Sequence, residues 1–186
     1  MKKHGLTLIE LLITIGLVGM ILIVITGVYV SGFRTYQEEL SSSMVQSNAQ
    51  TILDALATDI KNGMLIEQSY DVYITGTSSI IIRVPAINSD KQIQYSGTDM
   101  LYDRIIYYYQ SNEIHKLVFA DPSSTRYSAN GVDKVLDSKI LSLSFTYDPD
   151  QTTATLVTAT VSSDIKVGNR NKTITISGTA RLRNHI

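Results

Sequence analysis

The chain contains 186 residues, with 16 basic and 17 acidic side chains and a formal net charge of -1. That length suits one ordinary domain with an appendage, and the balanced charge argues against a protein that coats nucleic acid. The absence of cysteine excludes disulfides, thiolate metal sites and cysteine nucleophiles. Apolar residues make up 44% of the chain. Many of them lie within the first thirty positions, and this uneven distribution is the main indication of function.

The N-terminal segment predicts a membrane-spanning helix. Lys2 and Lys3 precede an apolar stretch over residues 6–30, and no charged side chain occurs between residues 11 and 30. About twenty apolar residues are what a helix needs to cross a hydrocarbon core. A cleavable secretory signal would have a shorter apolar region that ends in small residues. The basic residues before the span predict that the N-terminus stays in the cytoplasm and that the rest lies outside.

Glu10 is an acidic residue inside this apolar stretch. A carboxylate within a membrane is costly, and it is therefore a functional hypothesis by default. The alternative is that Glu10 reaches the headgroups and interacts favourably with the positive end of the helix dipole. The residues around Glu10 favour the functional interpretation.

The sequence GLTLIELL over residues 5–12 resembles the processing motif of type IV pilins and type II secretion pseudopilins. The resemblance implies that a prepilin peptidase removes the leader, residues 1–5, by cutting between Gly5 and Leu6. The same enzyme would then N-methylate Leu6. Glu10 would dock the subunit by neutralising an N-terminal ammonium on its own chain or on the preceding pilin subunit. Leu6 departs from the family pattern, in which phenylalanine is commoner at this position.

A helical pattern continues beyond the apolar span. Residues 31–63 carry an apolar stripe at steps of mostly three or four positions, which indicates an amphipathic helix. Asn62 and Gly63 predict its end, with the glycine as a left-handed cap. A single helix over residues 6–62 would be about 85 Å long, whereas a break near Gly27 or Gly32 would give two helices. The stripe consists of Phe33, Tyr36, Leu40, Met44, Ala49, Ile52, Leu53, Leu56 and Ile60.

From residue 64 to residue 186 the apolar pattern has a period of two, which predicts β-structure. Strands are expected at 79–84, at 104–109 and 114–119 around a Ser111-Asn112 turn, at 141–147, and in a terminal hairpin of 156–167 and 173–183. The regions 88–99 and 120–133 are expected to be rich in loops. A half-buried antiparallel sheet needs one face covered, and the amphipathic helix is expected to cover it. The fold class expected is therefore α+β, with a long N-terminal helix on an antiparallel sheet, as in type IV pilins.

Several later segments resemble J-type pseudopilins and W-type minor pilins, which are subunits found near filament tips. They are TILDALATDIKN at 51–62, IIYYYQSNEIHKLVF at 105–119, VLDSKILSLSFTYD at 135–148 and ISGTARLRN at 176–184. The resemblance implies the same arrangement of one helix against antiparallel sheet.

The sequence contains no pattern typical of catalysis, and we expect neither an enzyme nor a cofactor. His4, His115 and His185 lack metal-ligand spacing. Asp148 and Asp150 flank a proline, which is more typical of a turn than of a calcium loop. The final hairpin is basic through Lys166, Arg170, Lys172, Arg181 and Arg183. A solvated face explains these charges, and contact with a nucleic-acid backbone is the alternative.

Two function hypotheses result. The first is a minor pilin or pseudopilin, held in the cytoplasmic (inner) membrane and then moved into an extracytoplasmic filament, with prepilin peptidase and other pilins as partners. The second is a binding module at a pilus tip for DNA uptake or adhesion. A tethered enzyme or sensor is a third class, and nothing in the β-rich region supports it.

Overall fold

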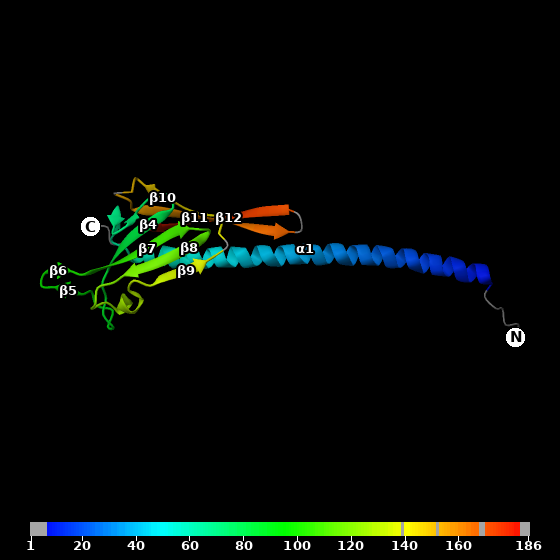
Figure 1. The fold of residues 1–186 in the computed structure, drawn as a ribbon, viewed down its shortest axis with the longest axis horizontal. Coiled ribbons are helices and arrows are strands. Elements are labelled where there is room, and N and C mark those ends of the chain that lie inside the picture. Colours follow the sequence, from blue (N-terminus) through cyan, green and yellow to red (C-terminus); the bar gives the residue numbers. More distant parts are fainter. Residues whose placement is uncertain (1–6, 139, 152, 168–169, 183–186) are drawn as a thin grey trace. The chain divides into compact units, whose positions relative to one another are not determined.

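The protein is described by a computed structural model that covers residues 7–138, 140–151, 153–167 and 170–182. The fold is α+β: one long N-terminal helix is followed by antiparallel β-structure, consistent with a type IV pilin-like architecture (Figure 1). The chain divides into two compact units, Met1–Ser43 and Met44–Ile186. The leader, residues 1–5, and Leu6 lie outside the described residues.

Helix α1 spans Leu8–Asn62 without interruption, so the interpretation as two helices is wrong. Gly27 and Gly32 are helical, and a Cβ at either would meet nothing within 4 Å. Isolated glycines weaken a helix by about 1 kcal/mol each, and this sequence has no proline there to remove a backbone hydrogen bond. Two glycines alone therefore do not break the helix.

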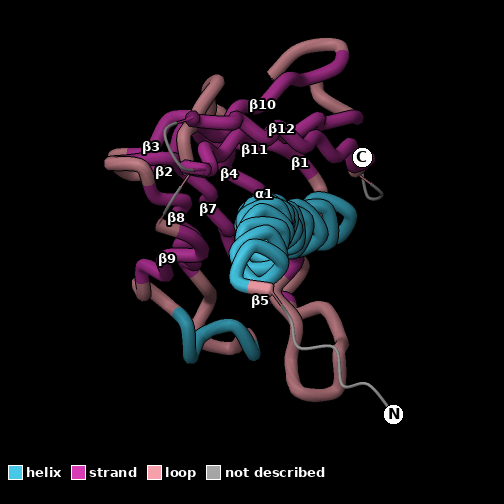
Figure 2. Tube along the Cα trace, turned by 90° about the vertical axis from the view of Figure 1, so that its right-hand side faces the viewer, coloured by secondary structure: helices cyan, strands magenta, loops and turns pink. Residues whose placement is uncertain are grey.

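The apolar stripe is buried only in its second half. Ala49, Ile52, Leu53, Leu56 and Ile60 are at most 5% exposed and belong to the core. The preceding stripe residues are at least 46% exposed, so the expectation that the whole stripe packs against the sheet is corrected; they are Phe33, Tyr36, Leu40 and Met44. Figure 2 distinguishes the strands from helix α1, whose buried residues all lie between Ala49 and Ile60.

The glycine that ends α1 has a different role from the one expected. Gly63 is not among the residues with positive φ, so it is not a left-handed cap. Its amide donates to the Ile60 carbonyl at 2.9 Å. A Cβ on Gly63 would lie 2.8 Å from side-chain carbons of both Ile82 and Leu182. The close packing of the helix end against the sheet therefore requires a glycine at position 63. A local sequence pattern cannot reveal this requirement.

In the described part of the chain, a five-stranded sheet has the order β1-β4-β7-β8-β9 and a three-stranded sheet has the order β10-β11-β12. Both sheets are antiparallel, and two short hairpins, β2–β3 and β5–β6, complete the β-structure. The strand bounds are β1 Leu65–Glu67, β2 Ser69–Tyr70, β3 Tyr73–Ile74, β4 Ser79–Pro85, β5 Tyr95–Ser96, β6 Asp99–Met100, β7 Tyr102–Gln110, β8 Glu113–Phe119, β9 Asp133–Asp137, β10 Ser142–Asp148, β11 Leu156–Val167 and β12 Arg170–Arg181. A 3-10 helix, η1, spans Thr125–Ala129. The strands expected from the period of two are confirmed within a few residues at each end.

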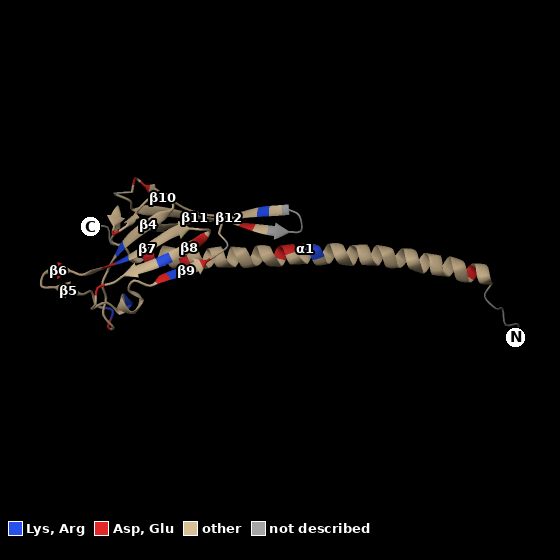
Figure 3. Cartoon of the chain, viewed as in Figure 1, with Lys and Arg blue, Asp and Glu red and all other residues tan. Residues whose placement is uncertain are grey.

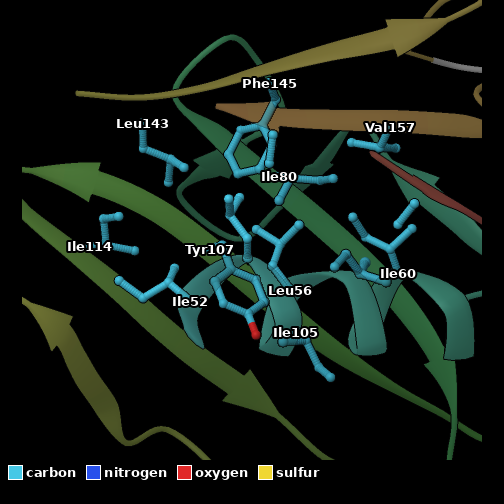
Figure 4. Packing of buried hydrophobic residues seen from close by; sticks show 14 of the residues in the cluster. Ile52, Leu56, Ile60, Ile80, Ile105, Tyr107, Ile114, Leu143, Phe145 and Val157 are labelled. Atoms are coloured by element: carbon cyan, nitrogen blue, oxygen red, sulfur yellow. The ribbon is translucent and has the colours of Figure 1, made fainter. Parts of the chain in front are cut away.

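The core lies between the buried stripe of α1 and the facing sides of both sheets (Figure 4). Its largest fully buried side chains include Tyr107 of β7, Phe145 of β10 and Val157 of β11. A second, smaller cluster of Ile81, Ile106 and Leu117 lies on the other side of the five-stranded sheet. Successive residues of a strand point to opposite faces of a sheet, which is why these residues face away from the core. We call the face on which they lie the outer face of the five-stranded sheet.

Candidate functional site

The first turn of α1 is closed by Thr7 and Glu10. The Thr7 amide and the Thr7 hydroxyl donate to Glu10 Oε2 at 2.9 and 3.0 Å, and the Glu10 amide donates to Thr7 Oγ1 at 3.4 Å. This reciprocal arrangement is a capping box, which satisfies backbone amides that have no partner inside the helix. The spacing Thr-x-x-Glu before an apolar run signals such a box, and the sequence interpretation overlooked it. Glu10 is therefore fixed beside the start of the helix.

The helix that follows is apolar on every side and exposed. Figure 3 shows one acidic residue near the start of α1 and then a long stretch without charge, which extends from residue 11 to residue 33. The large apolar side chains from Leu8 to Val30 are between 42% and 79% exposed. Among the described residues, α1 is long and apolar enough to cross a membrane. Removing so much apolar surface from water would be strongly favourable.

The polar side chains inside this segment are satisfied by the helix itself. The hydroxyls of Thr14 and Thr26 donate to the carbonyls of Glu10 and Leu22, each at 2.7 Å. An apolar environment tolerates only polar groups whose hydrogen bonds are internal. Because their hydroxyls are hydrogen-bonded within the helix, both threonines are compatible with an apolar environment.

The globular unit has a polar network that joins the helix to the sheet. Asp59 of α1 accepts hydrogen bonds from the Tyr107 hydroxyl and from Lys116 Nζ, both at 2.6 Å. Tyr107 is fully buried, and Figure 4 shows its oxygen at the edge of the apolar cluster. Burial of the ring and then the charge of Asp59 raise the pKa of Tyr107. These contacts fix the C-terminal part of α1 on the five-stranded sheet.

A second network fastens the long loop after β8. Asp103 is fully buried and accepts from the Ser124 hydroxyl at 2.6 Å, from Arg126 Nη1 at 2.8 Å and from the Asp121 amide at 2.9 Å. Arg126 also donates to the Pro85 carbonyl at 3.0 Å. A buried carboxylate is stable only when it is paired and hydrogen-bonded. The hydrogen bonds of Ser124, Arg126 and the Asp121 amide therefore stabilise the buried charge of Asp103 and hold the loop in place.

His115 lies on the outer face of the five-stranded sheet. Its ring stacks on Tyr108 with 4.7 Å between centroids, and its Nδ1 lies 3.0 Å from Asp133 Oδ2. Asp133 Oδ2 also accepts from the Tyr108 hydroxyl at 2.7 Å. No group of three His, Cys, Asp or Glu in the described residues could hold a metal ion.

The remaining predicted features are the acidic turn after β10 and the basic terminal hairpin of β11 and β12. The Asp150 carboxylate accepts from the Thr153 amide at 2.8 Å, as expected for a turn. In the terminal hairpin Lys172 and Arg181 are exposed, while the side chains of Lys166, Arg170 and Arg183 lie outside the described residues. Asp164 accepts from the Thr173 hydroxyl at 2.6 Å. A role of this hairpin in nucleic-acid contact stays a prediction.

No family model, no curated protein and no solved structure matches the chain. The candidate site is therefore defined by its own residues: the capped start of α1 with Glu10, and the exposed apolar helix that follows.

Proposed function

We propose that this chain is a minor pilin or pseudopilin, a structural subunit of a type IV pilus or a type II secretion pseudopilus. In this proposal the cytoplasmic membrane holds the precursor through α1, with the N-terminus inside. Prepilin peptidase then cuts between Gly5 and Leu6 and methylates Leu6. The mature subunit leaves the membrane for an extracytoplasmic filament.

The observation that carries the proposal is the exposed apolar half of α1. Its large apolar side chains from Leu8 to Val30 are exposed, whereas Ile60, near the C-terminal end of the same helix, is fully buried. A membrane anchor alone needs about twenty residues, and its helix does not have to continue into the core of a folded unit. A subunit that exchanges lipid for neighbouring helices in a filament needs both an exposed apolar helix and the continuation of that helix into a folded core.

Glu10 supports the same proposal by its chemistry. Cleavage after Gly5 would create an ammonium on Leu6, next to Thr7, whose amide already donates to Glu10. In an environment of low dielectric constant, an unpaired ammonium is expensive and a paired one is much less so. A carboxylate at this position lets an incoming subunit recognise the N-terminus of its neighbour.

The experiment that tests the proposal is mass spectrometry of the mature N-terminus in a host with an active prepilin peptidase. We expect a chain that starts at Leu6 with one added methyl group. A Gly5→Trp variant should keep its leader, because the peptidase must reach the bond after residue 5. Gly16→Ala, within the apolar span, is the matched control and should be processed normally. A mature chain that starts at Met1, or after Ser31, would contradict the proposal.

A further inference from the structure

Two arginines lie side by side on the outer face of the five-stranded sheet and share one carboxylate. Arg83 of β4 and Arg104 of β7 are directly paired in the strand register. Glu67 of β1 lies between them, with its Oε2 2.7 Å from Arg104 Nε and its Oε1 3.5 Å from Arg83 Nε. The side chain of Glu67 is 14% exposed, against 29% for Arg83 and 26% for Arg104. Both arginine side chains are thus partly exposed, while the carboxylate that they share is more covered.

The charges of this cluster do not balance. Like charges directly opposite each other on neighbouring strands are unfavourable, and one carboxylate neutralises only one guanidinium. Arg104 donates to Glu67, whereas the buried Nε of Arg83 makes no hydrogen bond. The ion pairs Asp59–Lys116 and Asp103–Arg126, by contrast, each match one base with one acid. Within the part of the chain that the structure describes, the two guanidinium groups share one carboxylate, and Arg83 Nε has no hydrogen-bond acceptor.

Both guanidinium groups are held in place by tyrosine rings. Arg83 Cζ lies 3.6 Å from the centroid of Tyr102, and Arg104 Cζ lies 4.2 Å from the centroid of Tyr70. Stacking fixes the plane of each guanidinium and leaves its edge available for oxygen acceptors. A site whose donors are ordered before binding loses less entropy when a ligand arrives.

The surroundings select the class of anion. Asp71 is exposed next to Tyr70, and Glu113 and Asp133 lie further along the same sheet. A polyanion such as nucleic acid would place its other charges near these acids, whereas one carboxylate supplies only the missing charge. We propose that Arg83 and Arg104 form a carboxylate-binding site for an Asp or Glu side chain of a partner protein. This site does not depend on the function proposed above.

The test is an NMR titration of the full chain, labelled with nitrogen-15, in non-ionic detergent micelles. Sodium acetate replaces sodium chloride at constant ionic strength, and the Nε–Hε signals of the arginines are followed. We expect saturable shifts at Arg83 and Arg104, with half-saturation on the order of 10 mM for a single charge-assisted contact. Dimethyl phosphate, which carries the same single charge, should bind more weakly.

Three variants separate a binding site from a purely structural cluster. Arg83→Gln should abolish saturation, while Arg181→Gln, which changes an exposed arginine of β12, should leave the titration unchanged. Glu67→Gln should lower the half-saturation concentration by about fivefold or more, because acetate no longer competes with an internal carboxylate. Circular dichroism establishes that each variant is folded.

Absence of saturable shifts in the wild type up to about 100 mM acetate would overturn the proposal, and this result does not require any variant to fold. Equal binding in Arg83→Gln would overturn it as well. Tighter binding of dimethyl phosphate than of acetate would show that the site is built for phosphate, and the assignment to a carboxylate would then be wrong.

Discussion

At the scale of single residues, Glu10 combines a capping role with a charge, and Thr7 allows the two to be separated. Thr7→Val removes the hydroxyl of the capping box but keeps the carboxylate, whereas Glu10→Gln keeps a hydrogen-bond acceptor but removes the charge. If the charge docks the subunit, Glu10→Gln should reduce filament incorporation by about tenfold or more, and Thr7→Val much less. The measurement is the ratio of filament-bound to membrane-bound protein. Equal reductions in both variants would assign Glu10 to helix capping alone.

Gly63 is a position where one added methyl group should destabilise the fold. In Gly63→Ala the new Cβ would lie 2.8 Å from Ile82 and from Leu182, and 3.0 Å from the Ile60 carbonyl. Overpacking of this kind costs about 1–3 kcal/mol. The control is Gly76→Ala, where a Cβ meets nothing within 4 Å. Urea unfolding of the full chain in micelles, followed by circular dichroism, should show a lower midpoint for Gly63→Ala only.

We expect the buried Tyr107 to make the folded protein less stable in alkaline solution. Burial, the charge of Asp59 and the hydrogen bond to it raise the pKa of Tyr107 in the folded chain, while an unfolded tyrosine ionises near pH 10. The unfolded state therefore loses a proton first, and the free energy of unfolding falls as the pH rises above about 10, by up to about 1.4 kcal/mol per pH unit. Below that pH the contribution is fully present.

The variant Tyr107→Phe should flatten this decline between about pH 10 and pH 11.5, although it also removes the hydrogen bond to Asp59. Tyr127→Phe serves as the control, since Tyr127 is 47% exposed. Urea midpoints measured across this pH range give the result. Identical slopes in the wild type and in Tyr107→Phe would mean that Tyr107 ionises normally in the folded protein.

At the scale of elements, the β7–β8 hairpin contains a strained turn. Ser111 and Asn112 both have positive φ, at 53° and 66°, as a two-residue turn of type I′ requires. Asn112 Oδ1 accepts from the Tyr109 hydroxyl at 2.9 Å, which gives this asparagine a partner. Ser111 is exposed, and a side chain there is disfavoured by about 1 kcal/mol in the left-handed region.

Ser111→Gly should therefore stabilise the globular unit by roughly 0.5–1 kcal/mol, because glycine adopts positive φ without strain. Ser111→Val should destabilise it, since a β-branched residue suits this region least. The two variants change the same exposed position, so each is the control of the other in urea unfolding. A lower midpoint for Ser111→Gly would show that the serine side chain, and not its backbone, matters here.

At the scale of the whole molecule, the boundary of the globular unit is testable. The compact unit begins at Met44, and the buried part of α1 begins at Ala49. A fragment of residues 44–186 should fold alone, because its stripe and both sheets form one core. A fragment of residues 31–186 keeps the exposed Phe33, Tyr36 and Leu40 and should associate more readily.

Circular dichroism and light scattering of the two fragments give the measurement. We expect cooperative unfolding of both and a monomer for residues 44–186. An unfolded shorter fragment, together with a folded longer one, would place the boundary of the autonomous unit near residue 31 instead.

Local patterns determined most elements of this protein. A period of two predicted β4, β7, β8, β10, β11 and β12 because each strand has one face in the core, and a stripe with helical spacing predicted the helix that ends at Asn62. The charge-free stretch after Glu10 predicted the exposed apolar half of α1 without reference to any tertiary contact. Composition and periodicity are properties of neighbouring residues, and the sequence by itself therefore determines these features.

Only the tertiary structure decided which apolar residues are covered and which distant charges meet. Phe33 and Ile60 occupy the same stripe, yet Phe33 is 52% exposed and Ile60 is fully buried in the core. Gly63 is required by Ile82 and Leu182, and Glu67 meets Arg83 and Arg104 across three strands. These contacts depend on strand order and register, which join segments far apart in the chain, and no local spacing in the sequence encodes them.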